Sequence, residues 1–199
     1  MTLPIVTLTP NDSGLKIGDA VPLIEPNVHD SCILADRDGT QVGLFLTELP
    51  ADLLNLVNIA DAELRTKRVP KSDMRRSSGL HNQAAEVKQY SAILGSCPPK
   101  PHMRRPYPSR SSVHGIASAK TFCRAMSAAG IKAFEVLRAN APQVVEGHLK
   151  AIKTRVPKQW SFSNHFTSTI SNANIAAAVH QDHANVKGAV NIIITKRRN

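Results

Sequence analysis

The sequence predicts a single α+β domain, and three observations lead to that prediction. Strand-like segments with turn residues open the chain, an alanine-rich helical stretch fills its middle, and β-branched residues gather near residue 190. The length of 199 residues allows one sizeable core and is short for two. We expect one domain in three parts: an N-terminal β cap with a helix (1–64), a basic proline-rich arm or loop (65–110), and a helical support followed by the start of a β core (111–199).

The first part combines a hairpin with one helix. The segments SCILA and QVGLFL flank turn residues that end in Gly39, which is typical of a β-hairpin. After Pro50 the apolar residues recur at helical spacing, and the pattern fades near Arg65. The residues of this stripe are Leu53, Val57, Ala60 and Leu64. We expect the helix to pack on the rest of the domain.

The middle of the chain predicts three helices. One apolar stripe is broken at Gly130, and a short second helix carries Phe134 and Leu137. The first stripe contains Ile116, Ala119, Phe122, Cys123 and Met126. Asn140 is the expected N-cap of a third helix, with Pro142 in its first turn. We expect Cys123 to pack in the core and His148 to be a hydrogen-bonded structural histidine.

Charge is distributed unevenly along the chain. Residues 1–64 carry ten acidic residues against two basic ones, whereas the rest of the chain carries 23 basic residues and five acidic ones. A surface of this sign attracts polyanions, and nucleic acid is the commonest of them. A solvated basic surface without a ligand is the alternative.

The basic and aromatic residues are densest in the proline-rich part of the arm. There a phosphate-tracking segment is expected to contact nucleic acid through Arg104, Arg105, Tyr107 and Arg110. An ordered but passive loop is the alternative.

Composition excludes several classes of protein. Three widely spaced cysteines at 32, 97 and 123 give neither a disulfide framework nor a metal knuckle. No stretch approaches the roughly 18 apolar residues of a membrane span, and residues 1–14 lack the pattern of a secretory signal. We expect a soluble protein of the reducing cytoplasm that does not enter a membrane.

The most informative chemistry lies in the last 40 residues, which are rich in strand-forming types. The run 188–195 predicts a buried strand, and IAAAV before it predicts another. His180 and Asp182 stand between them, and residues two apart in a strand point to the same face, so their side chains can meet at one metal ion. His183 is out of phase with them. One imidazole and one carboxylate, completed by a distant histidine, form the facial triad of non-haem Fe(II) oxygenases; an incidental surface strand end is the alternative.

The order of segments around this motif resembles a known family. A tryptophan-containing segment, FTSTISN, a short apolar strand, His-x-Asp, Asn185 and a further apolar strand resemble the core of the TET/JBP family of Fe(II)- and 2-oxoglutarate-dependent dioxygenases, in particular its phage and bacterial members. The likeness is closest over residues 160–194. A looser likeness covers the segment QYSAILGSCPPKPHMRRPYPSRSSVH.

The resemblance implies an enzyme that oxidises the methyl group of 5-methylcytosine or thymine in DNA. It implies that His180 and Asp182 bind Fe(II), that 2-oxoglutarate is the cosubstrate, and that Asn185 and Asn174 line the pocket or orient a ligand. It also implies that the helical middle packs on the opening strands of a double-stranded β-helix, or jelly roll.

The family also needs a distal histidine and a basic residue that holds 2-oxoglutarate, and neither follows His183 at the expected distance. We therefore expect a catalytic core that is incomplete at its C-terminus and inactive alone. A non-catalytic nucleic-acid-binding protein, and an oxygenase of the same fold acting on a protein or small molecule, are the alternative functions.

Overall fold

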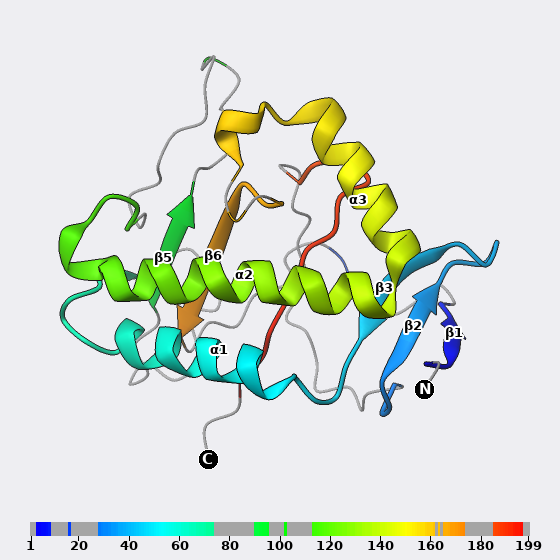
Figure 1. The fold of residues 1–199 in the computed structure, drawn as a ribbon, viewed down its shortest axis with the longest axis horizontal. Helices are drawn as coiled ribbons and strands as arrows, with labels where there is room; N and C mark the ends of the chain where they lie inside the picture. Colours follow the sequence, from blue (N-terminus) through cyan, green and yellow to red (C-terminus); the bar gives the residue numbers. More distant parts are fainter. Residues whose placement is uncertain are drawn as a thin grey trace.

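The computed structural model describes residues 3–8, 16, 28–73, 90–95, 102, 113–161, 163, 165–173 and 185–196. In this part of the chain, three α-helices and two small three-stranded sheets form a mixed α+β fold. The helices α1 and α2 lie side by side across one sheet, α3 rises from the C-terminal end of α2 on the side away from α1, and the other sheet lies beyond that same end of α2 (Figure 1). The α+β prediction is confirmed.

The predicted hairpin is present in the N-terminal sheet. Strands β2 (Cys32–Ala35) and β3 (Gln41–Phe45) pair antiparallel, and β1 (Ile5–Thr7) adds to β2 in parallel. In the turn, the Asp36 carboxylate accepts hydrogen bonds from the backbone N–H groups of Asp38 and Thr40 at 3.0 and 2.9 Å. A carboxylate that satisfies turn amides in this way explains why the sequence turns here.

Helices α1 (Ala51–Leu64) and α2 (Lys120–Asn140) form the central layer. The helix after Pro50 is confirmed, with Leu53 and Leu64 buried. The predicted break at Gly130 is wrong, because α2 runs through it without interruption. A glycine costs a helix interior only about 1 kcal/mol. Packing outweighs that cost, because Ala129 and Ala133 on either side are buried against α1.

Helix α3 (Pro142–Arg155) follows α2 after one residue. Asn140 is not its N-cap: Asn140 is the last residue of α2, and its side-chain amide donates to the Val136 carbonyl at 2.8 Å. Ala141 takes the cap position, and Pro142 starts the helix as expected. The buried face of α3 consists of Val144, Val145 and His148.

The second sheet has the order β4 (Ser72–Asp73), β5 (Tyr90–Gly95), β6 (Ser168–Ala173) and is antiparallel throughout. Its middle strand falls within the predicted arm 65–110, so that prediction does not hold for residues 90–95. Ala92 and Leu94 share one face of β5 and are buried, with Ala92 in the core cluster of the helices, and Ser91 on the opposite face is buried as well. Residues of α1, α2, β5 and β6 share one core cluster, so a helical layer packs on this sheet.

The predicted strand at 188–195 is not a strand in this structure. Residues 185–196 run outside both described sheets and pass behind α2 from α3 towards α1 (Figure 1). Alternate side chains still face opposite ways: Val190 and Ile192 pack on the helical core, whereas Ile193 is 83% exposed. The β-branched pattern therefore marks an extended chain buried on one side by helices rather than by a partner strand.

Among the described strands neither sheet closes into a barrel. No helix in the described part is both long and apolar enough to span a membrane.

Candidate metal centre and nucleic-acid surface

The predicted metal ligands His180 and Asp182 lie outside the described residues, and so does Asn174. The predicted nucleic-acid contacts fall outside them as well, namely Arg104, Arg105, Tyr107 and Arg110. Asn185 is described: it is exposed in a bend at the start of the 185–196 segment. The structure therefore describes the chain up to Ala173 before the motif and from Asn185 after it.

Both neighbouring segments of the motif are attached to the folded body. On the N-terminal side, β6 ends at Ala173, which pairs with Tyr90 of β5. On the C-terminal side, Gly188 lies against α3, where a Cβ built on it would be 3.6 Å from the Ala151 Cβ. The described chain thus pairs in the sheet up to Ala173, before His180, and lies against α3 at Gly188, after Asp182.

His148 links these two segments through its ring nitrogens. It is 1% exposed, and its Nε2 lies 2.9 Å from the carbonyl oxygen of His165. The backbone N–H of Val190 donates to its Nδ1 at 3.2 Å. Because Nδ1 accepts, Nε2 must carry the proton and donate to the carbonyl, which fixes one neutral tautomer. The expectation of a hydrogen-bonded structural histidine is confirmed.

Aromatic rings surround this histidine. The His165 ring stacks on Phe134 with a centroid distance of 3.8 Å, and Phe166 lies 5.4 Å from the His148 ring. The Arg138 guanidinium carbon is 5.2 Å from the Phe134 centroid. These contacts hold the residues just before β6 against α2 and α3.

Burial also keeps both imidazoles neutral. It lowers the pKa of His148, which the hydrogen bond to the His165 carbonyl only partly opposes. Burial, followed by the charge of Arg138 and the neighbouring His148, lowers the pKa of His165. Neither ring is then a cation at neutral pH.

The described residues do not supply a metal site of their own. No group of three or more His, Cys, Asp or Glu side chains that could hold a metal ion occurs among them. His148 already uses both ring nitrogens in hydrogen bonds to backbone groups, so it is not a free third ligand. The donor set of the motif, one imidazole and one carboxylate, does suit Fe(II).

Cys123, which lies in the described residues, has a structural role. Cys123 packs against the core cluster of α1 and α2, and its thiol lies 3.6 Å from the Val113 carbonyl oxygen. Burial raises the pKa of this thiol. A raised pKa disfavours the thiolate that a nucleophile needs, so the expectation of core packing is confirmed.

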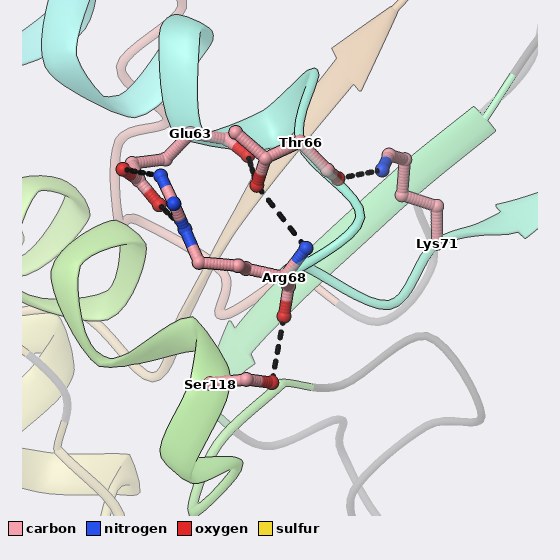
Figure 2. A network of polar contacts seen from close by, with 5 residues as sticks. All are labelled: Glu63, Thr66, Arg68, Lys71 and Ser118. Atoms are coloured by element: carbon pink, nitrogen blue, oxygen red, sulfur yellow. Dashed lines mark hydrogen bonds and ion pairs between the residues drawn. The ribbon is translucent and has the colours of Figure 1, made fainter.

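Part of the basic charge after residue 64 is neutralised inside the fold. Arg68 forms an ion pair with Glu63 at 2.7 Å, and its carbonyl accepts from the Ser118 hydroxyl at 2.8 Å (Figure 2). The Lys71 ammonium donates to the carbonyl oxygens of Thr66 and Val69. These basic residues cap the end of α1 and fix the turn that follows it.

Two further ion-pair groups join acids of α1 to cations elsewhere. Asp61 binds Arg65 at 2.7 Å and Lys196 at 3.0 Å. Lys132 of α2 lies 2.8 Å from Asp52. Acidic residues of the first 64 positions thus offset cations from later parts of the chain.

The five cations around the end of α3 have no ion-pair partner in the described residues. They are exposed, and they are Lys150, Lys153, Arg155, Lys158 and Lys187. They belong to the basic excess after residue 64, and no motif in the sequence distinguishes them. The available signal was the density of basic residues between positions 150 and 158.

Comparison with known protein families, with curated proteins and with solved structures found no match to this chain. Its function is therefore inferred from its own residues.

Proposed function

We propose that this protein is an Fe(II)- and 2-oxoglutarate-dependent dioxygenase that oxidises the methyl group of a pyrimidine base, 5-methylcytosine or thymine, in DNA. The observation that carries the proposal is the His180-x-Asp182 motif, set between a strand and an apolar segment. In this proposal β5 and β6 belong to the opening strands of a double-stranded β-helix. The helical layer packed on one face of their sheet supports that assignment.

In the proposed mechanism, His180 provides a ring nitrogen and Asp182 a carboxylate oxygen to the iron. Bound iron and 2-oxoglutarate supply the oxidising chemistry that replaces a methyl hydrogen with hydroxyl. Asn185 and Asn174 orient a ligand or line the pocket. The buried His148 is hydrogen-bonded to His165 before the motif and to Val190 after it, which fixes the chain at these two positions.

DNA is the proposed substrate because of the charge distribution and the geometry of the reaction. A methyl group on a stacked base cannot reach a buried iron, so the base must be flipped out or taken from a single strand, at a cost of a few kcal/mol. Basic side chains that contact the negatively charged phosphates offset this cost. The arm with Arg104, Arg105, Tyr107 and Arg110 is proposed to contribute such contacts.

The ligand assignment is tested by anaerobic calorimetric titration with Fe(II). His180→Ala and Asp182→Ala should each weaken iron binding at least about tenfold, since each removes one donor atom from the site. His183→Ala is the matched control, because His183 is one step out of phase in an extended chain, and it should bind iron like the parent protein. Equal affinity of His180→Ala and His183→Ala would overturn the assignment.

The substrate is tested by succinate formation from 2-oxoglutarate in the presence of methylated DNA, in a protein that also contains the distal histidine and the basic residue that the family needs. Stimulation by this DNA over unmethylated DNA supports the proposal. Iron binding without stimulation would favour an oxygenase for a protein or small molecule. DNA binding without iron binding would favour a non-catalytic nucleic-acid-binding protein.

A further inference from the structure

Exposed positive charge gathers around the C-terminal half of α3. Three separate segments contribute to it. Lys150, Lys153 and Arg155 come from α3, and Lys158 begins the short 3-10 helix Lys158–Trp160. Lys187 comes from the 185–196 segment, which contacts α3 through Gly188 at Ala151 and through Val190 at His148. We call these five cations the α3 basic surface.

This surface differs from the basic groups that acidic side chains neutralise in the described residues, whereas Lys67, Lys120 and Arg124 are exposed without an ion pair there, as its members are. Arg65, Arg68, Lys132 and Lys196 are held in ion pairs with acidic side chains. Within the described part of the chain, no such ion pair neutralises the α3 basic surface. Helix α3 contains one acidic residue, Glu146. The surface keeps a net positive charge of four when Glu146 is included.

Helix electrostatics accounts for only part of this charge. Cations in the last turn stabilise a helix by interacting with its macrodipole, which explains Lys153 and Arg155. It does not explain Lys158 or Lys187, because both lie outside α3. Exposed cations on neighbouring segments of the fold, outside the reach of one helix dipole, suit an extended anionic ligand.

We propose that the α3 basic surface binds the phosphate backbone of nucleic acid. The proposal rests on the proposed function for its choice of DNA, and it adds a contact region distinct from the arm at 104–110. Lysines act on phosphates as point charges, so this surface supplies affinity rather than sequence recognition. A membrane is a poorer match, because a helix that binds at a bilayer surface must expose an apolar face. In α3, Val144 and Val145 are buried, and Leu149, 39% exposed, is the one large apolar side chain that the helix exposes, which is less than an apolar face.

The test replaces one cation from each segment by glutamine, in the triple variant Lys150→Gln, Lys158→Gln, Lys187→Gln. Its matched control is Lys67→Gln, Lys120→Gln, Arg124→Gln, which removes the same charge from exposed positions elsewhere. Both are titrated with a fluorescent random-sequence duplex, without iron or 2-oxoglutarate, over a range of salt concentrations. Failure of the catalytic proposal therefore leaves this result unaffected.

The α3 variant should lose roughly tenfold or more in affinity for the duplex. Its log–log salt slope should flatten by up to about 2.7, which is about 0.9 for each lost phosphate contact. The control should change much less. Equal losses in both variants, or no loss in either, would overturn the proposal. A loss of binding to phosphatidylserine vesicles with unchanged DNA binding would also overturn it, in favour of a membrane surface.

Discussion

At the scale of single residues, both ring nitrogens of the buried His148 are hydrogen-bonded, and this arrangement depends on pH. Its ring both donates and accepts, with the His165 carbonyl on one side and the Val190 amide on the other. A protonated ring has two donors and no acceptor. Protonation would therefore set two N–H groups against each other at Val190.

This arrangement predicts acid sensitivity. The pKa of His148 is lowered from its ordinary value of 6.5 in the folded state, so the unfolded state binds protons more readily. The contribution of His148 to the free energy of unfolding is complete above that ordinary value. It falls as the pH drops towards the lowered folded value, and His165 acts in the same direction.

Urea unfolding at a series of pH values measures this dependence. His148→Gln should lower the free energy of unfolding by about 1–3 kcal/mol at pH values above the histidine range, because one hydrogen bond and several ring contacts are lost. It should also flatten the pH dependence below 6.5. His102→Gln, at an exposed position, is the control. A variant as acid-sensitive as the parent would contradict the assignment.

At the scale of elements, the pair β5–β6 depends on one glycine. Gly95 ends β5 with a φ of +95°, in the left-handed region that other residues rarely adopt. A Cβ placed there would collide with the backbone carbonyl of Thr167 and would lie 2.8 Å from the Ser168 Cα. The two strands can approach this closely only because a side chain is missing.

Gly95→Ala should therefore destabilise the fold by about 2–4 kcal/mol, from the combined strain and collision. Gly147→Ala makes the same chemical change within α3, where an added Cβ meets nothing within 4 Å. That variant should be neutral or up to about 1 kcal/mol more stable, because alanine favours the helix. Thermal unfolding of the two variants separates these outcomes, and similar behaviour of both would contradict the geometry at Gly95.

Elements with a local signal could be predicted from the sequence. The helix after Pro50 and the hairpin at Gly39 were predicted because their periodicity and turn residues lie within short windows. β5 was hidden because it is a short apolar run between proline-rich and basic stretches, and its pairing partner β6 lies more than 70 residues away. The helix break predicted at Gly130 was wrong because the packing of Ala129 and Ala133 on α1 is a long-range contact that local sequence does not reveal.

For the candidate site, the sequence predicts residue types that suit iron but cannot predict how they are held. The hydrogen bonds of His148 join positions 17 and 42 residues further along the chain. No spacing rule connects such distant partners.

At the scale of the whole molecule, the 185–196 segment ties the helical layers together. Ile192 contacts both the cluster of α2 with α3 and the cluster of α1 with α2. Beyond it, Lys196 reaches Asp61 of α1. The residue types of this segment predict pairing in a sheet. In the structure the segment instead contacts all three helices.

The two sides of this segment should respond differently to the same change. Ile192→Ser should lower the free energy of unfolding by about 1–3 kcal/mol, because it removes apolar area from two core clusters. Ile193→Ser alters an 83% exposed side chain and should change it by less than about 0.5 kcal/mol. Urea denaturation measures both. Equal effects would show that the segment does not dock in the described register.

The path of residues 185–196 also has a consequence for the order of events during synthesis on the ribosome. The ion pair between Lys196 and Asp61 spans 135 positions, and Ile192 completes clusters whose other members are synthesised much earlier. Helices α1 and α2 can meet as soon as both have left the exit tunnel, but their shared apolar surface stays partly uncovered until Ile192 and Ile194 follow. Such late, long-range closure slows folding and leaves a nascent chain exposed to aggregation.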